Sequence, residues 1–202
     1  MDSDNRPPLG VPMPAEYRYY GGMQPQPVGA LAIAAVLMVG LVAVVDVVDS
    51  VVAVQGKLVL EALVSLLKIV ALLCAGVVFV VWLWRARTNV EATAGVQTQR
   101  LGKGWGIGGW ICPIVNFWYP YRYLSDVWQT SAPERQRGTG LLLAWWLTFL
   151  AGHLVSYFSS YRGVISQPTV VVGNVLEIAS GVLVVLVVKR ISDWQTAAMR
   201  AA

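Results

Sequence analysis

Four long apolar segments constrain the fold of this chain more than any other feature of its sequence. A helix needs about 20 mostly apolar residues to cross roughly 30 Å of hydrocarbon. The segments at 28–54, 58–84, 139–161 and 169–188 all meet that length. Only 13% of the residues are charged and 56% are hydrophobic, whereas a soluble domain has about 25% charged residues. The sequence therefore predicts an all-α membrane protein with four transmembrane helices.

A fifth crossing at 105–121 is the alternative, because these seventeen residues carry no charge. Lys and Arg in short loops accumulate on the cytoplasmic side of a membrane protein. With four spans and the N-terminus inside, twelve basic residues lie on the cytoplasmic side, two lie outside, and Lys68 lies in the membrane. Five spans would put seven basic residues on each side. The charge bias favours four spans with both termini in the cytoplasm.

The Trp-rich segment 105–130 then belongs to the cytoplasmic face. Its apolar residues recur at alternating spacings of four and three, which is typical of an amphipathic helix. The stripe consists of Trp110, Ile114, Phe117, Tyr121, Leu124 and Trp128. Pro113 and Pro120 must bend or interrupt such a helix. We expect a broken interfacial helix or a shallow re-entrant segment, with Arg122 and Asp126 paired four residues apart on its polar face.

The remaining segments predict a simple organisation. Residues 1–27 are rich in Pro and Gly and cannot bury a core, so we expect a disordered cytoplasmic tail. Residues 28–194 form the four-helix membrane domain, and residues 195–202 form a short cytoplasmic tail. The basic residues lie beside apolar runs rather than in a basic domain, so nucleic acid is not an expected partner.

A set of Trp, Pro, Asn and charged residues lies at fixed offsets between the second and third spans. The set comprises Arg85, Arg87, Asn89, Trp105, Trp110, Pro113, Asn116, Pro120, Asp126 and Trp128. With these residues the chain resembles the actinobacterial membrane family called domain of unknown function 4328. The resemblance covers roughly the whole membrane part and excludes the Pro-rich tail. It implies a four-helix membrane domain in a bacterial inner membrane, and it implies no activity.

The motifs that would indicate catalysis are weak. Gly104, Gly106 and Gly109 spell GxGxxG, but no strand precedes them, so we interpret them as chance or as close backbone packing rather than a nucleotide site. The one histidine, His153, and the two cysteines show no metal-ligand spacing. We expect neither enzymatic activity nor a cofactor or metal.

Ionisable residues inside the spans are more informative, because a charge at a helix centre costs at least about 2.5 kcal/mol. Lys68 and Glu177 lie on helices that run in the same direction, about 15 and 12 Å below their outer ends. His153 lies at a similar depth, and so does Asp46 if the first helix continues to residue 54. We predict a buried polar layer built on a Lys68–Glu177 ion pair, with His153 and Asp46 nearby.

Two classes of function remain open. The first is a non-catalytic membrane scaffold or interaction module that uses its tail and its Trp-rich cytoplasmic segment. The alternative is a small channel or transporter subunit that uses the polar layer for protons or small cations. In either case the expected partners are the lipid bilayer, with anionic lipids at the cytoplasmic face, and a second copy or an unknown membrane protein.

Overall fold

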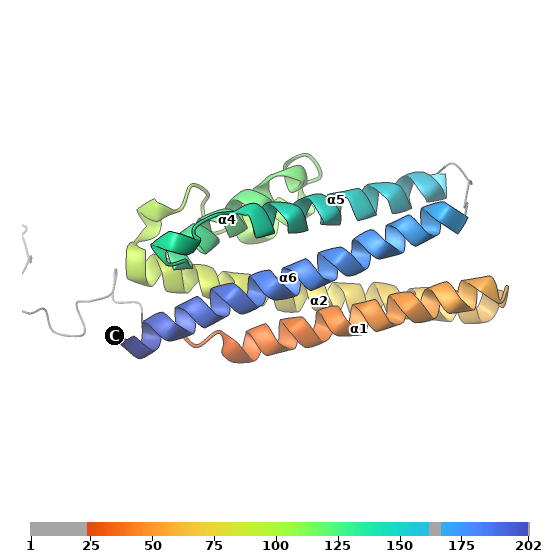
Figure 1. Cartoon of the computed structure of the whole chain (residues 1–202), viewed down its shortest axis with the longest axis horizontal. Coiled ribbons are helices and arrows are strands. Elements are labelled where there is room, and N and C mark those ends of the chain that lie inside the picture. The colour runs from red at the N-terminus through yellow and green to blue at the C-terminus, as the bar shows by residue number, and fades with distance from the viewer. Residues whose placement is uncertain (1–23, 162–166, 202) are drawn as a thin grey trace, which may run out of the picture.

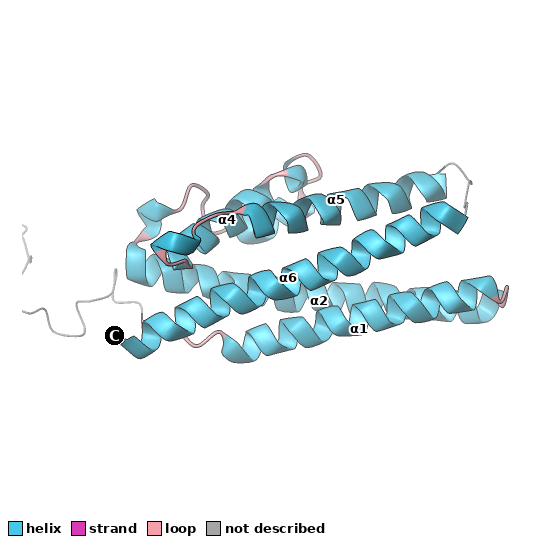
Figure 2. Cartoon of the chain, in the orientation of Figure 1, coloured by secondary structure: helices cyan, strands magenta, loops and turns pink. Residues whose placement is uncertain are grey.

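The computed structural model describes residues 24–161 and 167–201, and its architecture is a bundle of four long helices (Figure 1). These are α1 (Gly29–Val54), α2 (Leu58–Ala94), α5 (Gly140–Tyr161) and α6 (Gln167–Ala201). Each contains a stretch long and apolar enough to cross a membrane, as the sequence predicts. The described residues contain helices and loops without a strand (Figure 2). The all-α, four-helix prediction is therefore confirmed.

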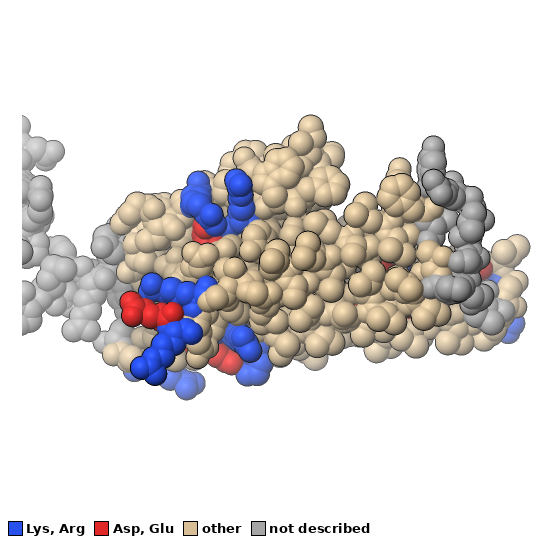
Figure 3. Space-filling model, turned by 45° about the horizontal axis from the view of Figure 1, so that its top comes forward, with Lys and Arg blue, Asp and Glu red and all other residues tan. Residues whose placement is uncertain are grey.

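Helices α2 and α6 extend well beyond their apolar parts. Helix α2 continues ten residues past Trp84, and α6 continues to Ala201. The residues at 195–201, predicted as a short tail, thus prolong α6, and their alanines favour helix. Lys and Arg side chains gather at this end of the molecule (Figure 3). We call it the basic end. The other end, where residues 55–57 join α1 to α2, is called the opposite end.

Gly95 ends helix α2 and turns the chain back toward the bundle. Its φ of 83° lies in the left-handed region that glycine adopts readily. Its N–H donates to the Glu91 carbonyl at 3.0 Å, and a Cβ at this position would collide with the Gln97 side chain. A short 3-10 turn, η3 (Val96–Thr98), follows, so the connection begins with a fixed direction.

The Trp-rich segment folds into a helical hairpin rather than one amphipathic helix. It consists of α3 (Trp105–Ile111), the 3-10 turn η4 (Val115–Phe117) and α4 (Tyr119–Ser131). Pro113 lies in the break after α3, and Pro120 occupies the first turn of α4, where a missing N–H costs nothing. A further 3-10 turn, η5 (Glu134–Gln136), leads toward α5. Because the breaks rotate the faces, the single apolar stripe is wrong: Ile114 and Phe117 are 72% and 54% exposed, whereas Leu124 and Trp128 are buried.

The hairpin enters the bundle from the basic end. The Trp110 ring at the end of α3 lies 5.9 Å from Phe79 and 6.3 Å from Phe149. Phe79 precedes Trp84 by five residues, so Trp110 reaches about 7.5 Å into the predicted span. The end of α3 therefore packs among the long helices.

The packing of the bundle differs between its two halves. Helix α1 packs against α2 and α6, and α5 packs against α6, while α2 and α5 are separated. The hairpin fills that separation at the basic end, where α4 contacts α2, α5 and α6. The largest fully buried side chains of the described residues lie at this end and include Trp82, Trp128, Tyr123, Leu142 and Ile191. Among the described residues, the opposite half holds a small core of Val45, Val52 and Val64.

Candidate functional site

A layer of charged side chains lies inside the bundle, toward the opposite end. Lys68 Nζ lies 2.8 Å from Asp46 Oδ1, and 3.9 Å from both Asp49 Oδ2 and Glu177 Oε2. The structure thus brings Lys68 and Glu177 together as the depth comparison suggests, but the direct ion-pair partner of Lys68 is Asp46. Helices α1, α2 and α6 each contribute to the layer.

His153 lies beside this layer without joining the ion pairs that the structure shows. Its Nδ1 is 2.9 Å from the Phe149 carbonyl oxygen of the preceding turn, and its ring is 4.2 Å from the Phe149 ring. The histidine therefore forms part of the wall of an adjoining cavity. It links the charged layer to a group of aromatic side chains.

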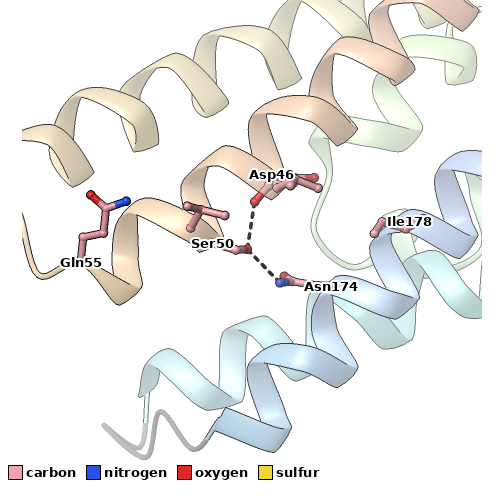
Figure 4. A pocket seen from close by; sticks show the side chains of 7 residues that line it. Asp46, Ser50, Gln55, Asn174 and Ile178 are labelled. Carbon is pink, nitrogen blue, oxygen red and sulfur yellow. Dashed lines mark hydrogen bonds between the residues drawn. The ribbon is translucent and has the colours of Figure 1, made fainter.

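Neutral polar side chains extend the layer, and two of them, Ser50 and Asn174, were not predicted from the sequence. Ser50 donates from Oγ to the Asp46 carbonyl at 2.9 Å and accepts from Asn174 Nδ2 at 2.9 Å (Figure 4). Ser156 donates to Glu177 Oε1 at 3.2 Å. Helical spacing could have identified them, because Ser50 lies four residues after Asp46 and Asn174 lies three residues before Glu177. Each therefore shares a helix face with a predicted residue.

Two cavities meet at Asp46. The first, of about 340 Å³, lies within the bundle, and its walls include Lys68, His153 and Glu177 as well as Asp46. The second, of about 560 Å³, lies between α1 and α6, where Ser50, Gln55 and Asn174 line it (Figure 4). The inner cavity ends toward the basic end at aromatic rings from α2, α3 and α5, which are Phe79, Trp110, Trp145 and Phe149.

A second polar cluster is buried at the basic end and centres on Arg87. This side chain is 1% exposed, and its Nε donates to Glu91 Oε1 at 2.8 Å. Its Nη2 donates to the Leu101 carbonyl at 2.9 Å, and its guanidinium lies 4.9 Å from the centre of the Tyr123 ring. Lys103 Nζ lies 3.5 Å from the other Glu91 oxygen. Burial raises the pKa of Tyr123 to about 12, with Arg87 opposing the rise and Glu91 adding to it.

Asp126 holds the connection between α2 and α3 against α4. This carboxylate is 4% exposed; its Oδ2 accepts from the Arg100 backbone N–H at 2.9 Å, and its Oδ1 from Arg100 Nε at 2.7 Å. The predicted Arg122–Asp126 pair is therefore wrong, and Arg122 is exposed. Asp126 pairs with Arg100 rather than Arg122 because Arg100 supplies both a backbone donor and a guanidinium to the same carboxylate. Charge-assisted hydrogen bonds of this kind are strong.

Asn89 joins three segments at the basic end. Its Oδ1 accepts from the Gln26 backbone N–H, and its Nδ2 donates to the Gln26 carbonyl, both at 2.8 Å. The same Nδ2 donates to Gln195 Oε1 at 2.9 Å. The tail predicted as disordered lies outside the described residues up to residue 23, but residues 24–28 are fixed here, and Val28 is fully buried.

The other residues of the motif also lie at the basic end or in the hairpin. Trp128 packs edge-on against Trp194 at 4.7 Å, and Trp105 packs edge-on against Tyr119 at 4.6 Å. Arg85 Nη1 lies 3.5 Å from the Pro27 carbonyl. Asn116 is in η4 with its Oδ1 buried. The motif therefore marks how the hairpin and the helix ends are held together, and only Trp110 lines the inner cavity.

The three glycines of the GxGxxG pattern have different surroundings. A Cβ on Gly106 would lie 2.8 Å from the Tyr123 ring, and one on Gly109 would lie 3.2 Å from Tyr119 Cβ. A Cβ on Gly104 would meet nothing within 4 Å. Close backbone packing of α3 against α4, one of the two interpretations, therefore explains Gly106 and Gly109. Along 24–161 and 167–201, no group of three His, Cys, Asp or Glu side chains comes together that could hold a metal ion.

Comparison with known proteins agrees with the motif. The family model described as "Domain of unknown function (DUF4328)" matches residues 46–193, which is more than half of the chain. The matched segment begins at Asp46, within α1, and contains the charged layer, the hairpin and the basic-end cluster. Neither the curated proteins nor the solved structures gave a match. The chain is an integral membrane protein that belongs to the DUF4328 family.

Proposed function

We propose that this protein is a non-catalytic scaffold or interaction module of an actinobacterial inner membrane, with its basic end and both termini in the cytoplasm. The direction follows from the excess of Lys and Arg at the basic end, since basic loops are retained on the cytoplasmic side. Figure 3 shows these side chains over one end of the visible face and a broad uncharged region beside them. The apolar region is then the part that contacts lipid.

The buried polar network at the basic end is the observation that carries the proposal. Arg87 and Glu91 hold the loop after α2, and Arg100 and Asp126 hold the same loop on α4. Burying charged groups costs free energy. The best-supported role of buried charge pairs is to fix one arrangement of the segments that they join. The network therefore fixes the shape of the surface formed by the hairpin and the loop after α2, which we call the platform. Recognition of a partner is the function that such a surface serves best.

The docked N-terminal segment supports the same function. The Asn89 side chain binds both backbone polar groups of Gln26, as a neighbouring strand would. The same Asn89 amide binds Gln195, so Gln26 is docked beside the end of α6. The platform and the tail would face a cytoplasmic partner together.

Removing the charge of Asp126 tests the module. In Asp126→Asn the pair with Arg100 is lost, so we expect the loop and the hairpin to shift and partner capture to fall at least tenfold. Arg122→Gln, an exposed change on the same helix, is the matched control. The measurement is recovery of a defined partner with the intact protein in mild detergent, followed by mass spectrometry.

Folding and specificity controls accompany that measurement. Glu177→Gln alters the charged layer without touching the basic end, so it should retain the partner. Each variant must elute from size exclusion as the wild type does. Equal recovery with Asp126→Asn and the wild type, at equal folding, contradicts the proposal.

Binding of anionic lipid is a second part of the proposal. Basic residues next to a span attract anionic headgroups by about 1 kcal/mol each, and salt screens the attraction. Within the described part of the chain, the exposed basic residues at this end are Arg100, Arg122, Arg135, Arg137, Lys189, Arg190 and Arg200. Phosphatidylglycerol should therefore bind the purified protein more tightly than phosphatidylcholine at low salt, with the difference shrinking at high salt.

A channel or transporter subunit remains the alternative, because carboxylates of α1 and α6 surround Lys68 and two cavities meet at Asp46. Its test is proton flux into proteoliposomes that disappears with Glu177→Gln at normal folding. The aromatic rings at the inner end of the cavity, with the packed core behind them, separate the charged layer from the basic end. We therefore expect no such flux.

A further inference from the structure

The cavity of about 340 Å³ within the bundle has two chemically different ends. Toward the basic end its wall is aromatic, with Phe79, Trp110 and Phe149 among the lining residues. Toward the opposite end its wall holds the carboxylates of Asp46 and Glu177 together with Lys68. Small-molecule sites are mostly apolar pockets of about 300–1,000 Å³ with a few fixed polar groups, and this cavity has that character.

The charged end favours a cation. Lys68 has three carboxylates within 3.9 Å, those of Asp46, Asp49 and Glu177, so one positive and three negative formal charges leave an excess of two negative charges. Asp46 takes the short contact with Lys68. Glu177 Oε2, at 3.9 Å from Lys68, is beyond hydrogen-bond length and retains acceptor capacity. In a wall of low polarity this excess attracts a positive group more strongly than it would in water.

The aromatic end favours an organic cation over a metal ion. Mg²⁺ and Ca²⁺ take six or more oxygen ligands, whereas the wall around Glu177 supplies few oxygens and many apolar groups. Aromatic faces attract quaternary ammonium groups, and their apolar surface binds a hydrocarbon body. The His153 ring contacts the Phe149 ring, and both line the cavity, so the aromatic and charged ends form one continuous surface.

The arrangement of the helices gives such a molecule a route. Helices α2 and α5 are separated, and the hairpin fills the space between them only at the basic end. In the other half α2 and α5 do not pack directly on each other, and the second cavity adjoins the first at Asp46. Entry is therefore from the lipid or from the opposite end, and the aromatic rings close the basic side.

We propose that this cavity is a binding site for a lipophilic organic cation, with the ammonium group beside Glu177 and Asp46 and the apolar body against Phe79, Trp110 and Phe149. The site uses a part of the molecule distinct from the platform at the basic end. A failure of cation binding would therefore leave partner capture unaffected, and the reverse also holds.

Two glycines provide a matched pair of variants. Gly76 lines the cavity, and a Cβ added to it meets nothing within 4 Å, so Gly76→Leu extends a side chain into open space. Gly40 on α1 is equally open but is not in the cavity wall, so Gly40→Leu is the control. Glu177→Gln removes one negative charge with little change in shape.

Equilibrium dialysis of the full chain in lipid nanodiscs against benzyltrimethylammonium, with empty nanodiscs as background, tests the site. We expect saturable binding by the wild type and Gly40→Leu, at least tenfold weaker binding by Gly76→Leu and Glu177→Gln, and no saturable binding of benzylsulfonate. The smaller Gly76→Ala replaces Gly76→Leu if the latter does not fold. Absence of saturable binding by the wild type, equal binding by the cavity-filling variant, or equal binding of the anion overturns the proposal.

Discussion

At the scale of single residues, the close contact between Lys68 and Asp46 carries a clear consequence for stability. Removing one member of an ion pair inside a span leaves the other charge without this partner in the membrane, which costs several kcal/mol. Lys68→Met should therefore lower the melting temperature in mild detergent by about 5–10 °C. The double variant Lys68→Met/Asp46→Leu should recover part of that loss. An unchanged melting temperature for Lys68→Met would show that the pair contributes nothing to stability.

Tyr123 gives a prediction about pH. Its pKa rises from 10.0 to about 12 on folding, so the unfolded chain loses the phenolic proton at a lower pH than the folded chain. The contribution of the protonated side chain is complete below pH 10 and is lost as pH rises toward 12. Across this pH window the free energy of unfolding should fall by up to about 2.7 kcal/mol more in the wild type than in Tyr123→Phe, as measured by thermal unfolding. If the free energy of unfolding depends on pH in the same way in both proteins, the pKa shift of Tyr123 is contradicted.

At the scale of elements, close packing of α3 on α4 depends on Gly106. A methyl group there would lie 2.8 Å from the buried Tyr123 ring, so Gly106→Ala should displace the hairpin and expose residues of α3 and α4 to limited proteolysis. Gly104 has helical dihedrals and open space around its Cα, so Gly104→Ala should behave as the wild type. Equal protease sensitivity of the two variants would show that the close approach is not needed.

The hairpin also shows what the sequence was able to predict and where it stopped. The distribution of Lys and Arg and the positions of Pro113 and Pro120 were enough to predict a broken segment that does not cross the membrane. The depth of the segment and the faces of its parts were not predictable, because each proline break changes the direction of the chain. Asp126 finds Arg100 across a turn set by Gly95, and this partner is not encoded by helical spacing.

At the scale of the whole molecule, the four spans follow from length and hydropathy, since each apolar segment had only one way to satisfy its backbone in lipid. Depth counting brought Lys68 and Glu177 together because both helices run in the same direction. It did not identify Asp46 as the closer partner, since the rotation of α1 about its axis depends on packing. For the cluster at the basic end, the sequence indicated the motif residues but not their contacts. Contacts such as that between Asn89 and Gln26 join segments 63 residues apart.

We propose a four-helix bundle whose hairpin enters and leaves on one side of the membrane. Single cysteines on a background free of Cys74 and Cys112 test it most directly, with an impermeant maleimide applied to intact and opened spheroplasts. Cysteines at Thr98, Arg135 and Arg200 should label only after opening, and a cysteine at Lys57 should label in both. Labelling of positions 98 and 135 from opposite sides of the membrane would make the hairpin a fifth span and contradict the account.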